Sequence, residues 1–532
     1  MKHLLTPRAI LLASALAITP AAWAETPANT LVVAAAIDDI ISLDPAQSFE
    51  FSGNDVNQNT YDRLVDFDPM DMEAGFKPSL AESWEVADDG MSITFTMRDG
   101  VTFHSGNPVR AEDAAWSLQR AVILNKTPAF ILTQFGFTPE NVEEKVTFDD
   151  TTLTLHLDQP YAPTFVLNCL TANIASVVDK ETVMANAQGE DLGNTWLNTN
   201  EAGSGPYVLA GWRPNEAVQL TAYEDYFQGA PAMKRVVVRN VAESSAQRLL
   251  LEQGDIDAAR NLSPTDVESV AAVEGVKIQD EPRGRILYMG LNQKDPVLSN
   301  PQVVEAMKHL VDYDGIANSF LKGTFVPHQS FLPTGYLGAI DDMPWTLDVA
   351  KAKALIDEAG MSGKTIVTKV RDLREYLDVA QALQASMAEA GLTLEIQQMT
   401  GAQVLDAYRA RDVPVFIGEW GPDYSDPNTN ASTFAYNPDN SDEAQATGLL
   451  AWRNAYAVPQ EMNEATVAAT LEQDAEKRAQ MYQDIQRQYQ AEAPIVPLFQ
   501  RVENTGLRET VQNWNSGGAV TSVMYRQVTK GE

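Results

Sequence analysis

The fold of this chain is decided by the stretch 365-TIVTKVRDLREYLDVAQALQASMAEAGLTLEIQQM-399. Residues 365–370 are rich in β-branched side chains and predict a strand. Apolar residues then recur every three or four positions up to Ala390, which predicts a helix that ends at Gly391. Residues 392–396 alternate between apolar and polar types, as in a second strand. The stretch therefore predicts one βαβ unit.

The segments on either side repeat this pattern. A helix is predicted from 349 to 359, because Asp348 can cap its start and Gly360 can end it. A further helix over 402–410 precedes a short apolar strand, 415–418. Helices that alternate with short strands predict an α/β fold with a mainly parallel sheet.

The first third of the chain mixes strands and helices. Residues 92–97 alternate between polar and apolar types and predict a strand. Asp99-Gly100 is a turn dipeptide and is followed by the apolar and β-branched residues 101–103. We therefore expect a hairpin between 92–97 and 101–103.

The N-terminus has the pattern of a secretory signal peptide. Residues 1–8 carry Lys2 and Arg8 without an acid, an apolar run covers 9–18, and 22-AWA-24 is a small-x-small cleavage site. The apolar run is far shorter than the ~20 residues that span a bilayer. Because no cysteine lies at the cleavage site, we expect a signal peptide over 1–24, no lipid anchor, no membrane insertion, and a location in the periplasm.

The composition limits the possible partners. The 532 residues carry 38 basic and 73 acidic side chains, a formal net charge of −35. Such a surface repels phosphate backbones and anionic lipids, which argues against nucleic-acid and membrane binding.

The length predicts two or three domains, and the single cysteine, Cys169, cannot form an internal disulfide. We expect a monomer.

Side chains suited to a ligand follow two of the predicted strands. Arg371 and Arg374 come after the strand 365–370, and the loop after 415–418 contains Trp420, Asp423 and Tyr424. In open α/β sheets the ligand crevice lies at the carboxyl ends of the strands. A guanidinium suits a carboxylate, an aspartate suits an ammonium, and aromatic faces hold apolar or cationic groups. The pattern predicts a cleft for a zwitterion, and the alternative is an exposed loop with a capping Asp and a surface Arg.

A series of short motifs spans nearly the whole chain. In order, they are 80-LAESWE-85, 89-DG-90, 98-RDGV-101, 103-FHSG-106, 203-GSGPY-207, 252-EQGDID-257, residues 306–314, residues 350–360 and 493-APIVPL-498. In this order they resemble family 5 extracellular solute-binding proteins, the dipeptide- and oligopeptide-binding proteins of ABC importers.

The resemblance implies a two-lobed periplasmic-binding-protein fold of the cluster C type, with three domains and a hinge. Domain I would be discontinuous, with domain II inserted in it and domain III following its second piece. The implied boundaries are 25–72, 193–288 and 499–532 for domain I, 73–192 for domain II and 289–498 for domain III.

The resemblance also implies the function. The chain would be the substrate-binding component of an ABC importer, which captures a short peptide between its lobes and delivers it to the permease subunits. Neither a cofactor nor a catalytic residue is expected. An alternative is the same fold binding an opine, an oligosaccharide or another cationic metabolite.

Site residues are implied by local matches to the family. Its peptide binders hold the ligand's amino terminus with the aspartate of a W-x-x-D loop, matched here by Trp420 and Asp423. The arginine that receives the carboxylate would fall near Arg371 or Arg374. A further match is the segment Phe51, Ser52 and Gly53, which resembles the part of domain I whose backbone and hydroxyl groups contact the ligand.

Glu419 departs from the family pattern, in which a small residue commonly precedes this tryptophan. An extra acid in the cleft would favour a basic side chain or a cationic ligand that is not a peptide.

A periplasmic hydrolase is the alternative from a different class. The run 202-AGSGP-206 lacks the G-x-S-x-G nucleophile elbow, and the histidines after the signal peptide are scattered without an H-E-x-x-H motif.

Overall fold

The computed structural model of the chain describes residues 26–68, 71–517 and 522–531. The predicted signal peptide, residues 1–24, lies outside these ranges. Within them, no helix is both long enough and apolar enough to cross a membrane.

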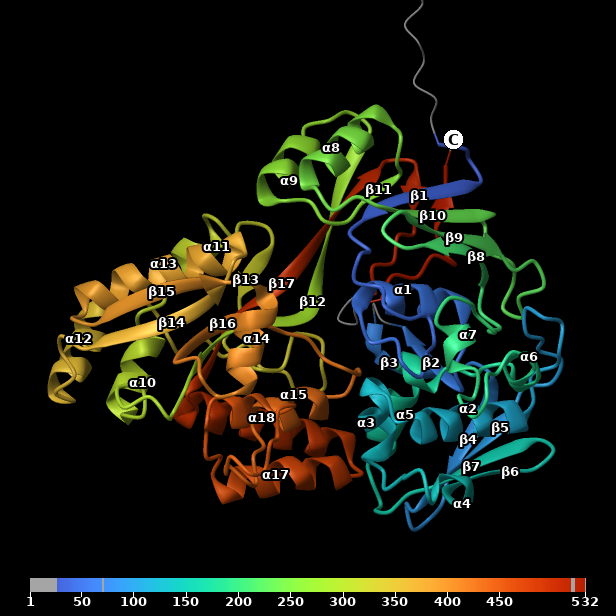
Figure 1. Cartoon of the computed structure of the whole chain (residues 1–532), viewed down its shortest axis with the longest axis horizontal. Helices are drawn as coiled ribbons and strands as arrows, with labels where there is room; N and C mark the ends of the chain where they lie inside the picture. Colours follow the sequence, from blue (N-terminus) through green and yellow to red (C-terminus); the bar gives the residue numbers. More distant parts are fainter. Residues whose placement is uncertain (1–25, 69–70, 518–521, 532) are drawn as a thin grey trace, which may run out of the picture.

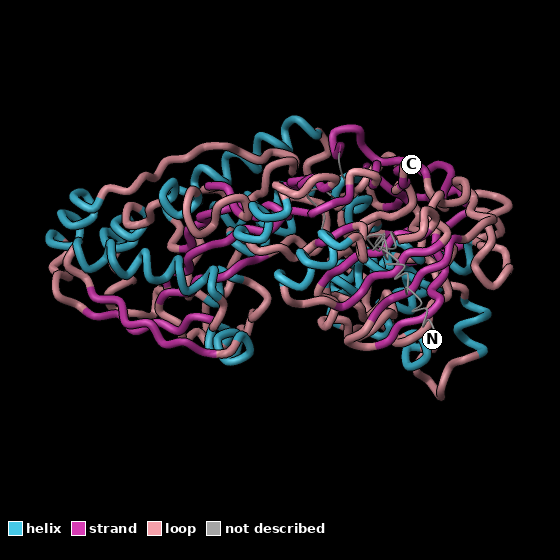
Figure 2. Tube along the Cα trace, turned by 90° about the horizontal axis from the view of Figure 1, so that it is seen from above, coloured by secondary structure: helices cyan, strands magenta, loops and turns pink. Residues whose placement is uncertain are grey.

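The molecule has two lobes joined by two long antiparallel strands (Figure 1). The strands are β12 (Val276–Leu291) and β17 (Ile495–Arg508), which pair with each other along most of their length. Figure 2 shows the lobes side by side when the molecule is seen from above. The predicted two-lobed α/β fold is confirmed.

The two lobes have separate hydrophobic cores. Residues 286–499 supply the cores of one lobe, which we call the second lobe. The described residues of 26–281 and 503–531 form the first lobe and supply its cores, to one of which Tyr424 of the second lobe is added. The chain therefore crosses between the lobes at 282–285 and 500–502, which we call the hinge. The predicted domain boundaries at 288/289 and 498/499 fall inside β12 and β17 and stay a prediction.

The first lobe combines a large sheet with a smaller one. Its strands are β1 (Thr30–Ala35), β2 (Val65–Asp68), β3 (Asp71–Pro78), β4 (Ala81–Val86), β5 (Ser92–Met97), β6 (Val146–Phe148), β7 (Thr152–His156), β8 (Tyr207–Arg213), β9 (Ala217–Ala222), β10 (Arg235–Asn240), β11 (Ala258–Ala259), β18 (Val511–Gln512) and β19 (Thr529–Lys530). Its helices are α1 (Phe51–Thr60), α2 (Ala111–Leu124), α3 (Phe130–Thr133), α4 (Val142–Lys145), α5 (Pro163–Leu170), α6 (Lys180–Ala185), α7 (Asn194–Leu197), α8 (Ser244–Gln253) and α9 (Pro264–Val270).

The second lobe contains the stretch that decides the fold. Its strands are β13 (Phe325–Pro327), β14 (Thr365–Arg371), β15 (Thr393–Met399) and β16 (Val415–Trp420). Its helices are α10 (Pro301–Lys308), α11 (Tyr313–Ala317), α12 (Val349–Glu358), α13 (Arg374–Glu389), α14 (Gly401–Arg409), α15 (Asn428–Phe434), α16 (Leu450–Arg453), α17 (Gln460–Leu471) and α18 (Ala475–Glu492).

One sheet connects the lobes. Its strand order is β16-β12-β17-β11-β1-β10-β9-β8, and β13 also pairs with β17. The smaller sheet of the first lobe has the order β4-β5-β7-β6. Because the hinge strands belong to the connecting sheet, side chains on them lie between the lobes.

Most elements predicted for the second lobe are confirmed. Asp348 accepts a hydrogen bond from the backbone N–H of Lys351 at 2.8 Å and so caps α12, and Gly360 follows its end with a φ of +69°. β14 and β15 pair in parallel, as the βαβ prediction requires.

The prediction that 415–418 joins the same parallel sheet is wrong. β16 pairs antiparallel with β12, from Val415 opposite Leu291 to Trp420 opposite Ile286. Near β14, the hydroxyl of Thr368 bonds the backbone carbonyl of Val415, but the two strands form no ladder. The long hinge strand offers β16 a free edge, and local periodicity does not reveal a partner so distant in sequence.

The predicted hairpin between 92–97 and 101–103 is also wrong. β5 pairs with β4 and β7 instead, and Thr102 makes only an isolated bridge to Pro108. Val101 and Phe103 are buried in the core of the first lobe. Burial of these two side chains directs the chain inward after the turn at Gly100 and away from β5.

Candidate functional site

The loop after β16 lies where the two lobes meet. Tyr424, a residue of the second lobe, is buried in a core of the first lobe. Its ring lies 6.1 Å from that of Phe165 in α5, and its hydroxyl donates to Gln134 Oε1 at 3.4 Å. Tyr424 therefore fixes the predicted ligand loop against the first lobe, with Asp423 beside the interface.

Other contacts between the lobes surround this loop. The backbone N–H of Ala162 donates to the carbonyl of Thr470 at 2.8 Å. Asp426 forms a buried ion pair with Arg478, with Nη2 and Oδ1 2.7 Å apart, and Asn168 of α5 donates to its Oδ2 at 3.3 Å. The lobes are thus in contact along α5. This is the arrangement expected of a form closed around a ligand.

Asp423 faces a cavity of about 170 Å³ between the lobes, which we call the aspartate cavity. The first lobe contributes Phe49, Phe51, Asn54 and Thr171 to its lining, and the second lobe contributes Tyr336 and residues 421–425. Both lobes are needed to form it, so opening at the hinge would open this cavity.

The carboxylate of Asp423 has no hydrogen-bond donor and no ion-pair partner among the described residues. Burial alone raises the pKa of this carboxyl to about 7. The backbone N–H of Asp423 donates to Thr429 Oγ1 at 3.0 Å and holds the loop in place. Asp423 is partly buried, and an unpaired charge withdrawn from water is unfavourable, so an ammonium in the cavity would pair favourably with it.

The carboxylate of Glu419, in contrast, has bonding partners within the protein. Arg501 holds both of its oxygens, with Nε 2.6 Å from Oε2 and Nη2 2.6 Å from Oε1, and the Tyr376 hydroxyl donates to Oε1 at 3.0 Å. Burial would raise the pKa of Glu419, but the charge and hydrogen bonds of Arg501, the charge of Arg285 and the bond from Tyr376 lower it to about 2. The charge of Glu419 is compensated within the protein.

A larger cavity of about 480 Å³ lies beside the hinge, and we call it the arginine cavity. Five arginines line it: Arg260, Arg283, Arg285, Arg374 and Arg501. Besides Arg501, which holds Glu419, carboxylates hold Arg260 and Arg283. Arg260 Nη1 lies 2.5 Å from Asp55 Oδ2, and Glu503 accepts from Arg260 Nε at 3.0 Å and from Arg283 Nε at 2.7 Å. Phe51 lines both the arginine and the aspartate cavity.

The structure brings some of the predicted site residues together. Ser52 lines the arginine cavity, and its hydroxyl donates to the carbonyl of Ala36 at 3.3 Å. Arg374 lies at the edge of the same cavity with a side chain 91% exposed, 3.4 Å from Asp378. The two cavities are thus lined by Phe51, Ser52, Arg374, Asp423 and Tyr424 among the predicted residues.

Other predicted residues lie outside both cavities. Arg371 is exposed at the end of β14, beside Gly401. Gly53 packs against Ser48, since an added Cβ on Gly53 would come within 2.5 Å of Ser48 Oγ. The ring of Trp420 packs against Phe434 with centroids 5.8 Å apart.

The sequence reasoning missed the arginines of the hinge. Arg283 and Arg285 flank Gly284 in β12, and Arg501 lies in β17. All three are far in sequence from the predicted loop. Two arginines directly before the apolar run 286–291 were a signal of this cluster. Its position became visible only once β12 and β17 were known to pair.

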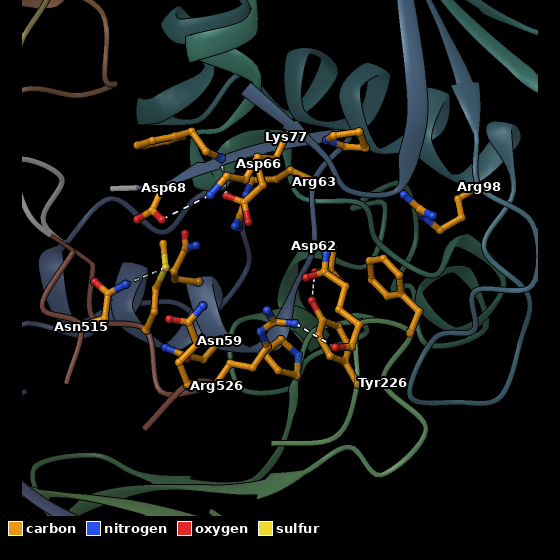
Figure 3. A pocket seen from close by; sticks show the side chains of 18 residues that line it. Asn59, Asp62, Arg63, Asp66, Asp68, Lys77, Arg98, Tyr226, Asn515 and Arg526 are labelled. Carbon is orange, nitrogen blue, oxygen red and sulfur yellow. Dashed lines mark hydrogen bonds and ion pairs between the residues drawn. The ribbon is translucent and has the colours of Figure 1, made fainter. Parts of the chain in front are cut away.

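A third cavity, of about 290 Å³, lies within the first lobe (Figure 3). Charged groups there have partners, since Lys77 Nζ lies 3.2 Å from Asp68 Oδ2 and the Tyr226 hydroxyl donates to Asp62 at 2.8 Å. None of its described lining residues comes from 286–499. Closure of the lobes would not enclose a ligand there, so the cavities between the lobes are the better candidates.

Comparisons with known proteins place the chain among solute-binding proteins. Residues 75–442 match the family described as bacterial extracellular solute-binding proteins, family 5 Middle. The probable D,D-dipeptide-binding periplasmic protein DdpA of Escherichia coli K12 is 28% identical over 534 residues, with 99% of this chain and 98% of that protein covered.

Solved structures share the fold. The periplasmic binding protein DppA of Helicobacter pylori, in complex with the peptide STSA, superposes with a TM-score of 0.78 at 22% identity, over 94% of this chain and 98% of that chain. MoaA of A. tumefaciens R10, in complex with mannopinic acid, has a TM-score of 0.76 at 20% identity, over 95% and 100% of the two chains.

Proposed function

This chain belongs to family 5 of the bacterial extracellular solute-binding proteins, and we propose that it captures a short peptide between its lobes and delivers it to the permease of an ABC importer. The relative in E. coli is named as a binder of D,D-dipeptides, and the H. pylori structure contains a peptide. We further propose that the protein acts as a monomer in the periplasm, after removal of residues 1–24 and without a lipid anchor, and that it binds without catalysis.

The unpartnered carboxylate of Asp423 carries this proposal. It lies in a cavity made by both lobes, and the described residues give it no compensating charge. The ammonium of a peptide would supply that charge and a donor for each carboxylate oxygen. Ligand binding and lobe closure would therefore stabilise each other, since closure buries the pair.

The hinge supplies the motion. Within the part of the chain that the structure describes, the backbone passes between the lobes at 282–285 and 500–502, and the pairing of β12 with β17 shifts register at this point. A small rotation there would move the loop that carries Asp423 away from α5. The open form would admit the peptide, and the closed form would dock on the permease.

A ligand screen with a matched variant tests the role of Asp423. We expect alanylalanine to raise the unfolding temperature of the mature protein, and Asp423→Asn to abolish this rise because it removes the negative charge while retaining the shape. Affinity for the free amine should fall toward tenfold per pH unit below about pH 7, where Asp423 is protonated in the unliganded protein.

The control is N-acetyl-alanylalanine, which has no ammonium and should stabilise wild type and variant equally little. Equal stabilisation of Asp423→Asn and wild type by alanylalanine would refute the role of Asp423. Failure of every peptide to bind wild type, together with binding of an opine or a sugar, would refute the peptide cargo.

A further inference from the structure

Arg285 differs from the other arginines that line the arginine cavity. Arg260, Arg283 and Arg501 each bond a carboxylate, and Arg374 lies 3.4 Å from Asp378. Arg285 has no hydrogen bond and no ion pair with any residue that the structure describes. Its guanidinium lies over the ring of Phe51, 3.7 Å from the centroid.

The hinge geometry places Arg285 at the cavity. Pro282 pairs with Val502 and Ile286 pairs with Gln500, so residues 283–285 stand opposite Arg501 alone. Such a bulge redirects side chains, and bulges are common beside functional sites. The side chain of Arg285 is partly buried and lines the cavity between the lobes.

The charges around Arg285 leave its own charge without a bonded counterion. Burial lowers its pKa, and the positive charges of Arg501 and Arg283 act in the same direction. The carboxylates of Glu419 and Glu503 act in the opposite direction, but both are held by other arginines. An anion bound in the cavity would supply the missing partner, and a guanidinium fork suits a carboxylate in particular.

The stem of Arg285 lies beside the loop that carries Asp423. An added Cβ on Gly421 would come within 3.3 Å of Arg285 Cγ, so residue 421 touches the stem of that arginine. Asp423 follows two residues later, within about 7 Å of extended chain. Phe51 lies between the two charged groups, because it lines both cavities and carries the guanidinium on its ring.

We propose that Arg285 binds a carboxylate of the ligand, so that the cargo is a short zwitterion with its ammonium at Asp423 and its carboxylate at Arg285. This assignment rests on the proposed capture of a ligand between the lobes, and it replaces Arg371 and Arg374 as carboxylate receptors. A dipeptide carries both charges on one short molecule. A neutral oligosaccharide or a purely cationic metabolite would leave Arg285 without a partner.

Calorimetric titration of the mature protein with paired ligands tests the proposal. The probes are alanylalanine and its C-terminal amide, each as the L,L and D,D form. Wild type should bind the free carboxylate about a hundredfold more tightly than the amide, since truncating one partner of a buried charge pair is costly. Arg285→Gln should bind both with similar affinity and should fold, because no ion pair is lost.

Arg374→Gln is the matched control, since this arginine lines the same cavity with an exposed side chain. It should keep the preference for the free carboxylate. The proposal is overturned if Arg285→Gln keeps that preference, or if Arg374→Gln or Arg371→Gln loses it.

An anion titration separates this proposal from the peptide cargo. If no peptide binds wild type, the peptide cargo fails, and acetate then tests Arg285 alone. Acetate should raise the unfolding temperature of wild type more than that of Arg285→Gln, relative to chloride at the same ionic strength. An equal response of the two proteins would overturn the anion site.

Discussion

Glu419 and Asp423 lie four residues apart at the end of β16 and in the loop after it, and the fold treats these two acids in opposite ways. Glu419 receives bonds from Arg501 and Tyr376, and its pKa falls to about 2. Asp423 receives none from the described residues, and its pKa rises to about 7. Position beside the cleft therefore does not by itself distinguish the two carboxylates. They differ in whether the described residues supply a donor, and the proposed role of Asp423 rests on that difference.

The first test removes the partner of Glu419. Arg501→Ala would leave Glu419 buried without its main counterion, in the condition of Asp423. Breaking one side of a buried ion pair costs about 3–5 kcal/mol, so we expect a loss of this size in the free energy of unfolding. Urea unfolding of the ligand-free protein measures it.

Arg374→Ala is the control for this test. Its side chain is 91% exposed, and substitutions at such positions change stability by less than about 0.5 kcal/mol. If the two variants lost similar stability, the bond between Arg501 and Glu419 would not be the stabilising interaction described here.

The second test uses the raised pKa of Asp423. Between about pH 4 and 7 this carboxyl is protonated in the folded protein and ionised in the unfolded chain, so the folded state binds more protons. Stability of the ligand-free protein then falls as pH rises, and the contribution of Asp423 between pH 5 and 7 is about 2 kcal/mol. Asp423→Asn should lack this contribution.

The measurement is the difference in unfolding free energy between wild type and Asp423→Asn at several pH values. The variant should become the more stable protein as pH rises toward 7, although it loses ligand binding. A difference that does not change with pH would contradict the raised pKa of Asp423.

Local sequence patterns correctly predicted features that depend on interactions between neighbouring residues. The cap at Asp348 and the helix end at Gly360 follow from backbone groups within one turn, and both are confirmed. The partner of β16 and the course of residues 101–103 depend on strands and cores distant in sequence, so periodicity predicted both incorrectly.

The candidate site shows the same division. The W-x-x-D match drew attention to Asp423, which the structure places in the aspartate cavity. Arg285 was not predicted, because its exposure to the cavity depends on a bulge between β12 and β17, strands separated by some two hundred residues. The pairing of Glu419 with Arg501 was hidden for the same reason.

The smallest effect is expected at Glu419, where the sequence suggested a preference for basic ligands. Because Arg501 already holds both carboxylate oxygens, Glu419→Gln should change the ratio of affinities for alanyl-lysine and alanylalanine by less than about threefold, which is below ~0.7 kcal/mol. Calorimetric titration with the two dipeptides measures this ratio, and Asp423→Asn should weaken both together. A selective loss of alanyl-lysine in Glu419→Gln would show that this acid reaches the ligand, and that the two carboxylates share the cleft after all.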